Sequence, residues 1–189
     1  MKKMILLMAA AMFFAACGGG GAKMDIRTGG RDTSLSVKSS GSDKGVKTFT
    51  DKENKVTTAT SFYAIMANYD MDTTNVATMK KPLTAPDQAR VMVQLIGEEG
   101  TNQDSELKPG TYKADPAGKF MKVDSLSVIT YADGKEVNTS FDMMFSGSKV
   151  TGEVRVKSVT ADAVSGEIDI TEGDKSVKGT FSAKIAAKK

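Results

Sequence analysis

Three segments near the C-terminus share one pattern of alternating apolar and polar residues. They begin at Val150, Val164 and Val177, which stand 14 and 13 residues apart, and each has a glycine two residues later. Successive side chains of a β-strand point to opposite faces, so this pattern predicts strands with one face buried and the other in water. The short spacing indicates an antiparallel meander rather than a solenoid.

The glycines occupy inward-facing positions of these expected strands. Gly152, Gly166 and Gly179 each remove a side chain beside bulky neighbours. A glycine inside a strand marks a bend, a bulge or a close approach of backbone. Three of them in register indicate a coiled sheet that closes into a barrel or bends over a packed partner. Simple relief of crowding is the alternative.

Further strands are expected upstream, where Val, Thr and aromatic residues are enriched between turn signals. One of these segments, Ser61–Tyr69, is apolar on both faces, and its pattern is also compatible with a buried helix. The connection Asp70–Asp87 contains two prolines and room for one helical turn near Thr74–Met79. The upstream strand segments are Val46–Thr50, Val56–Thr60, Ser61–Tyr69, Arg90–Gly97, Thr111–Lys113, Leu126–Thr130 and Val137–Phe145.

These patterns predict an all-β domain over residues 46–189. The expected architecture is an antiparallel β-sandwich or a small β-barrel of about eight to ten strands. Asp133-Gly134 is expected to form a hairpin turn, because both residues tolerate positive φ.

The other end of the chain has the features of an export signal. Lys2 and Lys3 precede an apolar run of thirteen residues, Met4–Ala16. A helix needs about 20 residues to cross a bilayer core of ~30 Å, so this run is too short to span one. Its size and flanks are those of a secretory signal, and residues 1–16 are therefore predicted to be a signal peptide.

The end of this run, Phe14-Ala15-Ala16-Cys17, resembles the lipobox of bacterial lipoprotein signals. Ala15, Ala16 and Cys17 match the pattern, and Phe14 stands where leucine is usual. The resemblance implies cleavage before Cys17 and lipid attachment to it, so that the N-terminal lipid holds the protein at a membrane. Gly18 is not aspartate, which implies the outer membrane rather than the inner one where a cell has both. A plain signal peptide with an incidental cysteine is the alternative.

The downstream half also carries a resemblance. The glycine-containing segments from Val150 on, together with the turn Leu107–Tyr112, are similar to β-meander domains of uncharacterised bacterial lipoproteins. That resemblance implies an envelope location and an all-β fold but no chemistry.

Residues 17–45 are rich in Gly, Ser, Asp, Lys and Thr. Such a composition buries too little apolar area to offset the entropy of the chain. We therefore predict a lipidated, disordered tether, with Leu35–Val37 as its one candidate strand. A flexible tether of this length would hold the domain on the order of 30 Å from the membrane surface.

The composition excludes several kinds of function. The chain has no histidine and a single cysteine, Cys17, so nucleophile–histidine catalysis and the usual zinc sites are excluded. The formal charge of +3 falls to +1 when Lys2 and Lys3 leave with the signal, and no basic stripe indicates nucleic-acid binding. Carboxylate catalysis stays formally open, but no acidic pair stands out. We predict no catalytic residue, cofactor or metal site.

Three weaker patterns have simple explanations. Asp70, Asp72 and Thr74 have the spacing that begins a calcium loop, but the later positions hold Asn75 and Lys81, so a solvated loop is expected. Four further acidic residues read as ordinary loop charges rather than a cation site. Four methionines could line an adaptable pocket, although core filling is the simpler interpretation. The four acidic residues are Glu98, Glu99, Asp104 and Glu106. The four methionines are Met66, Met92, Met143 and Met144.

Together these features predict a membrane-anchored envelope lipoprotein that is not an enzyme. Its expected role is structural, or it binds an envelope protein or another envelope component. The alternative is a β-barrel carrier of a small apolar ligand such as a lipid, because a small barrel can enclose one ligand.

Overall fold

A computed structural model describes residues 21–145 and 147–185. The predicted signal peptide, residues 1–16, and the predicted lipid site, Cys17, lie outside the described residues. The described part contains strands and one helical turn: β1 (Lys23–Thr28), β2 (Arg31–Ser36), β3 (Ser39–Thr50), β4 (Val56–Ala67), α1 (Val76–Met79), β5 (Ala89–Ile96), β6 (Gly110–Lys113), β7 (Lys122–Ala132), β8 (Lys135–Phe141), β9 (Val150–Val159), β10 (Ala163–Glu172) and β11 (Lys175–Lys184).

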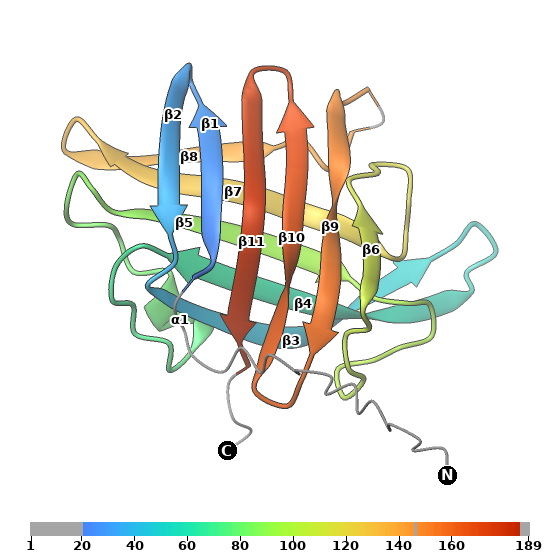
Figure 1. Ribbon diagram of the computed structural model, residues 1–189. Coiled ribbons are helices and arrows are strands. Elements are labelled where there is room, and N and C mark those ends of the chain that lie inside the picture. The colour runs from blue at the N-terminus through green and yellow to red at the C-terminus, as the bar shows by residue number, and fades with distance from the viewer. Residues whose placement is uncertain (1–20, 146, 186–189) are drawn as a thin grey trace, which may run out of the picture.

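All 11 strands belong to one sheet, which folds over into two layers (Figure 1). The order is β2-β1-β11-β10-β9-β6-β7-β5-β4-β3, and β8 pairs with β7 outside this path. Strands β1, β2, β6, β9, β10 and β11 cross in front of β3, β4, β5, β7 and β8 at a steep angle. Neighbouring strands are antiparallel except β6 and β7, which are parallel. The predicted all-β, mainly antiparallel architecture is confirmed.

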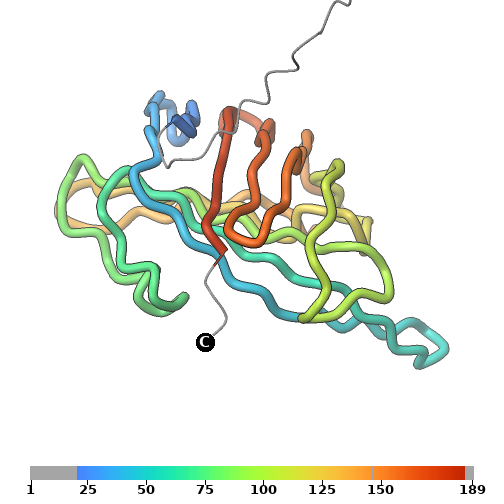
Figure 2. The backbone as a smooth tube through the Cα atoms, turned by 60° about the horizontal axis from the view of Figure 1, so that its bottom comes forward, coloured from blue at the N-terminus to red at the C-terminus, as the bar shows by residue number. Residues whose placement is uncertain are grey.

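The sheet does not close, so the predicted barrel is wrong. Closure would need a continuous ladder between the two ends of the strand order, β2 and β3. Instead, β3 meets the end of β11, where Ser42 and Ile185 form an isolated bridge. Because a barrel requires every strand to have two paired neighbours, this single contact leaves an open, folded sheet with free edges (Figure 2).

The core lies between the two layers. Nine apolar positions of the three C-terminal repeats point into it, each at most 5% exposed, whereas the last position of the third repeat, Ile185, is half-buried. From the other layer, Phe62 and Val93 are completely buried against the same cluster. The alternation in the sequence therefore predicted the buried face of the meander correctly. The repeat positions are Val150, Val154, Val156, Val164, Ile168, Ile170, Val177, Phe181 and Ala183.

The three glycines of the repeats mark places where neighbouring backbones approach closely. A Cβ on Gly152 would lie 1.9 Å from the carbonyl oxygen of Asp169, and one on Gly166 would lie 2.0 Å from that of Arg155. On Gly179 it would lie 2.1 Å from the carbonyl oxygen of the residue that begins β1. Of the alternatives raised by the sequence, close backbone approach is confirmed at all three glycines, and at Gly166 the pairing of β9 with β10 also has a bulge or irregularity.

Residues 23–45 form strands, which corrects the prediction of a disordered tether. They make up β1, β2 and the first half of β3. β1 pairs with both β11 and β2, and it brings Met24 and Ile26 into the core together with Leu35 of β2. Composition alone misleads here because these short strands complete an existing sheet edge and need few apolar side chains of their own.

The strands between residues 46 and 141 agree with the predicted segments. β3 and β4 form the expected hairpin, and Ser61–Ala67 continues β4 with both faces covered. α1 is the expected helical turn. β8 ends at Phe141, before the predicted end at Phe145. The carboxylate of Asp142 accepts hydrogen bonds from the backbone N–H groups of Met144 and Phe145, and this local turn ends the strand.

Tyr112 provides a testable link between the turn at residues 108–110 and the core. Its ring is completely buried, and its hydroxyl donates a 2.8 Å hydrogen bond to the carbonyl oxygen of Lys108. We expect Tyr112→Phe to lower the free energy of unfolding by about 1 kcal/mol near neutral pH, because the hydrogen bond from the buried ring to the Lys108 carbonyl oxygen is lost.

The same variant has a predicted pH dependence. Burial raises the pKa of the Tyr112 phenol, so above pH ~10 the unfolded chain releases a proton that the folded chain keeps. Wild-type stability should therefore fall as the pH rises through this range, and the advantage over Tyr112→Phe should shrink. Urea unfolding of both proteins between neutral and alkaline pH measures this difference. A constant difference across the range would contradict it.

Candidate functional site

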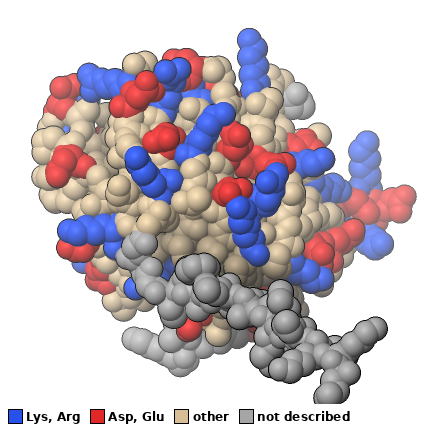
Figure 3. Space-filling model, in the orientation of Figure 1, with Lys and Arg blue, Asp and Glu red and all other residues tan. Residues whose placement is uncertain are grey.

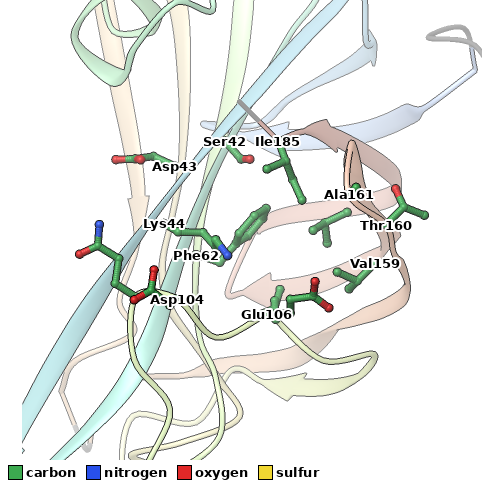
Figure 4. Close-up of a pocket in the computed structure, with 13 residues that line it drawn as sticks. Ser42, Asp43, Lys44, Phe62, Asp104, Glu106, Val159, Thr160, Ala161 and Ile185 are labelled. Atoms are coloured by element: carbon green, nitrogen blue, oxygen red, sulfur yellow. The ribbon is translucent and has the colours of Figure 1, made fainter. Parts of the chain in front are cut away.

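A cavity of about 510 Å³ lies between β3 and β4 on one side and the β9–β10 turn on the other (Figure 4). Phe62, Leu107 and Val164 are its buried apolar residues. Val159 and Ile185 complete the apolar lining, and in Figure 4 these two side chains and the Phe62 ring surround a common space.

Short-range hydrogen bonds shape the β9–β10 side of this pocket. The N–H of Thr160 donates to the carbonyl oxygen of Ala163 at 2.9 Å, and the Thr160 hydroxyl accepts from the N–H of Ala163 at 3.1 Å. This closes a tight turn and places Val159 and Val164 at its two ends. The N–H of Ile185 donates to the carbonyl oxygen of Asp162 at 2.8 Å, which brings Ile185 beside the same turn.

Two serines of β3 hold the end of β11 at the pocket. The Ser42 hydroxyl donates to the carbonyl oxygen of Lys184 at 2.8 Å, and the Ser40 hydroxyl accepts from the N–H of Lys184 at 3.4 Å. Both serines are buried, at 4% and 7% exposure. This polar contact joins the two layers beside the pocket without a continuous strand ladder.

The loop between β5 and β6 forms the remaining wall. The Thr60 N–H donates to the Thr101 hydroxyl at 2.8 Å, and the Thr60 hydroxyl donates to the carbonyl oxygen of Asn102 at 2.6 Å. The ammonium of Lys44 donates to the carbonyl oxygen of Ser105 at 3.3 Å. These contacts attach the loop to β3 and β4, and they bring its acidic residues to the mouth of the pocket.

The pocket face carries charges of both signs. Lys44 pairs with Phe62 across β3 and β4, so its side chain lies on the same face as the pocket, and Asp104 and Glu106 come from the loop between β5 and β6. Asp43 pairs with Tyr63 and therefore projects from the opposite face of β3. The pocket thus combines an apolar interior with a polar mouth.

The structure separates the four methionines instead of gathering them. Met66 and Met143 are buried in the core, which is the simpler of the two interpretations. The thioether of Met92 accepts a 3.1 Å hydrogen bond from the Tyr63 hydroxyl. Met144 is 79% exposed. None of the four lines the pocket described above.

The candidate calcium loop is occupied by local contacts. The Asp72 carboxylate accepts from the N–H of Thr74 at 3.0 Å and from its hydroxyl at 2.5 Å, and these bonds hold its pKa below the usual range. Asp70 pairs with Lys38 at 3.2 Å. Over the part of the chain that the structure describes, no three acidic, His or Cys side chains converge as metal ligands.

The outer face of β9–β11 carries charges of both signs, and they pair across the strands. Arg155 contacts Glu153 at 2.5 Å and Glu167 at 3.8 Å, and Lys157 also contacts Glu167. The Lys157 hydrogen bond is the main reason why the pKa of the Glu167 carboxyl is lowered. Figure 3 shows basic and acidic side chains interspersed over this face, without a continuous basic patch.

Arg90 of β5 is a buried arginine that the sequence analysis did not identify. Its side chain is 5% exposed, and it donates to the carbonyl oxygen of Lys81 at 2.6 Å and to the Glu136 carboxylate at 3.1 Å. Glu136 also accepts from the N–H of Leu83 at 2.8 Å. The group thus attaches the connection between β4 and β5 to the sheet. The signal in the sequence that could have identified Arg90 was one charged residue beside an apolar strand pattern.

Comparisons with known proteins do not place the chain in a family. No family model matches it, and neither the curated proteins nor the solved structures contain a match. Among the described residues, no helix has the length and apolar character needed to cross a membrane.

Proposed function

We propose that this protein is a membrane-anchored envelope lipoprotein whose β-domain binds a partner or ligand and has no catalytic role. The signal-like residues 1–16 followed by Cys17 carry the anchoring part of the proposal. β1 begins at Lys23, so six backbone steps separate the proposed lipid site from the sheet. Six residues span at most ~20 Å, which would keep the domain closer to the membrane than a long tether would. The outer membrane is the proposed location in a cell that has two membranes, because Gly18 follows Cys17.

Substitution of Cys17 tests the anchor. In its native cell, the wild-type chain should incorporate labelled palmitate and sediment with membranes, whereas Cys17→Ser should do neither, because it lacks the thiol that accepts lipid. Stable anchoring takes more than one acyl chain, so loss of the modified residue should release the protein completely. Phe14→Leu is the matched control, since it brings the segment closer to the usual lipobox and should keep the label. Wild-type protein that is unlabelled and soluble would refute the anchor.

A small apolar ligand is the second candidate for what the domain binds, and the pocket is the observation that favours it. Its volume of about 510 Å³ falls in the range of small-molecule sites. Its lining includes Phe62, Leu107 and Val164. This candidate needs no closed barrel, because the pocket lies where the two layers of the open sheet meet.

Native mass spectrometry of gently extracted protein can test this second candidate. A stoichiometric adduct, in addition to the N-terminal lipid, is expected for the wild type. Ala161→Trp should reduce it at least tenfold, because the large ring would occupy the pocket beside exposed Ala161. An Ala132→Trp protein, changed on a different hairpin, should keep the adduct. If the wild-type domain carries no adduct and instead captures an envelope protein on crosslinking, the first candidate, binding of a protein partner, would be favoured.

A further inference from the structure

We propose that the pocket between β3–β4 and the β9–β10 turn takes up the acyl chain of a lipid from the bilayer to which the protein is anchored. This inference rests on the proposed function, and it specifies the chemical class of the ligand and its source. Two observations carry it: the apolar lining of the pocket, and the position of the pocket at the end of the sheet where β1 begins.

The pocket lies at the end of the front layer where the chain enters the sheet. In Figure 1, β1 begins at the lower end of this layer, and the β9–β10 turn, which forms one wall of the pocket, lies at the same end. β3 contributes to the opposite wall and is the lowest strand of the layer behind. The β1–β2 and β10–β11 turns lie at the upper end. An anchor that precedes β1 would therefore lie nearer to the pocket than to these turns.

The strand registers describe the same arrangement. β1 is antiparallel to β11, so the residues before Lys23 lie toward the end of β11 that leads to Ile185. The carbonyl oxygen of Ala22 accepts from the N–H of Val37 at 2.9 Å, so the chain already follows this direction before β1. The N–H of Lys23 donates to the Thr180 hydroxyl at 3.3 Å, and Ile185 of the pocket follows Thr180 after five residues, about 17 Å along a strand.

The length of the segment between the proposed lipid site and the sheet matches this separation. Cys17 precedes Lys23 by six residues, which span at most ~20 Å. A lipid on Cys17 would therefore hold the end of the sheet that contains the pocket close to the bilayer, and the β10–β11 turn would point away from it.

The interior of the pocket suits a hydrocarbon chain. Phe62, Leu107 and Val164 are 0%, 3% and 1% exposed and supply no polar side-chain atom. Ser42 is the buried polar residue of the lining, and its hydroxyl already donates to the carbonyl oxygen of Lys184. An acyl chain has no hydrogen-bonding group along its length, so burial there leaves none without a partner. The mouth carries charges of both signs, so the interior is what specifies the ligand.

A bilayer is also where such a ligand is found. Removal of an alkyl chain from water is favourable by about 0.8 kcal/mol for each CH₂ group, so acyl chains reside in membranes and are scarce in solution. Transfer from the bilayer into the pocket exchanges one apolar environment for another. A pocket tethered beside the bilayer meets these chains at a high effective concentration.

Two anchoring points at opposite ends of the sheet can test the source of the ligand. The mature chain, residues 17–189, keeps every described strand, and its only cysteine, Cys17, would be coupled to a maleimide lipid in a phosphatidylcholine nanodisc. The comparison protein carries Cys17→Ser and Asp174→Cys, so that it is coupled through an exposed residue of the β10–β11 turn. The nanodisc contains phosphatidylcholine with a diazirine at the end of one acyl chain, and mass spectrometry of peptides locates the crosslinks.

We expect crosslinks at the lining residues Phe62, Val159 and Val164 when the protein is coupled through Cys17. Their yield should be about tenfold lower in the Asp174→Cys protein, because its anchor holds the pocket away from the bilayer and geometry then prevents the encounter.

Two variants of the protein coupled through Cys17 show whether the chain lies inside the pocket. Ala161→Trp should lower the yield about tenfold, because the large ring would occupy the pocket. Ala132→Trp, changed on the β7–β8 hairpin outside the pocket, should leave the yield unchanged.

Lysophosphatidylcholine with the same diazirine chain, added to both uncoupled proteins without nanodiscs, tests the pocket independently of the bilayer and should label it equally in both. If it does so, but coupling through Cys17 gives no higher yield than coupling through the β10–β11 turn, the bilayer is not the source, and ligand binding itself stands. No label in the pocket from either reagent would refute ligand binding there. A wild-type chain that takes up no palmitate in its native cell would remove the anchor and this inference with it.

Discussion

Gly152→Ala is expected to lower the free energy of unfolding by about 3 kcal/mol or more, because the new Cβ would meet backbone that cannot move aside. That Cβ would lie 1.9 Å from the carbonyl oxygen of Asp169 on the neighbouring strand β10. Gly152 also has a φ of 108°, a conformation that alanine rarely adopts. For a domain of this size, about 3 kcal/mol corresponds to a decrease in Tm of roughly 6–12 °C. Urea unfolding and calorimetry measure both quantities.

Gly45→Ala is the matched control for this substitution. Gly45 also lies in a strand, β3, but a Cβ there would meet nothing within 4 Å. We expect a change within about 1 kcal/mol, and a small gain is reasonable because alanine restricts the unfolded chain. If Gly152→Ala were as stable as Gly45→Ala, the close approach of β9 and β10 would be disproved.

The second large effect is expected at Arg90. Arg90→Ala should lower the free energy of unfolding by about 3–5 kcal/mol, because it leaves a carboxylate and backbone carbonyl groups without their cation. The guanidinium holds the carbonyl oxygen of Lys81 at 2.6 Å and the Glu136 carboxylate at 3.1 Å. Arg90→Lys should recover only part of the loss, since one ammonium cannot reach both groups in the arrangement of a planar guanidinium. Urea unfolding at fixed pH gives the comparison.

Arg27 provides the matched control for Arg90. It forms an ion pair with Asp32 at 2.7 Å, but the two side chains are 57% and 71% exposed. An exposed pair of this kind contributes little, so Arg27→Ala should change the free energy of unfolding by less than about 1 kcal/mol. Equal losses in Arg27→Ala and Arg90→Ala would show that the buried network does not hold the β4–β5 connection as described.

Local patterns predicted the strands well where a long segment alternates or carries a clear turn. The segments after Val150, Val164 and Val177 form β9, β10 and β11 with the expected faces buried. Asp133-Gly134 forms the expected hairpin turn, with φ values of 52° and 78°. Both signals are local, because side-chain alternation and positive φ depend on the residue and its immediate neighbours.

Predictions that relied on composition or on distant pairing were less successful. Residues 23–45 have the composition of a linker, but β1 gains backbone hydrogen bonds from the edge of β11, which begins about 150 residues later in the chain, and β2 pairs in turn with β1. The prediction of a closed barrel was wrong for a related reason. The glycines correctly indicated bending, but whether a bent sheet closes depends on which edges meet, and between β3 and the end of β11 the only bridge among the described residues is the isolated one of Ser42 and Ile185.

The sequence by itself excluded histidine chemistry and predicted most strands, because both depend on residue type or short-range spacing, and the same kind of local pattern is the basis for proposing a signal peptide before Cys17. Only the tertiary structure decided that the sheet stays open and that Arg90 is buried and paired with Glu136 of β8. It also placed Phe62 of β4 and Val164 of β10 in the lining of one apolar pocket. These features join segments far apart in the chain, and the energies that bring such segments together arise from packing and backbone pairing that local patterns do not encode.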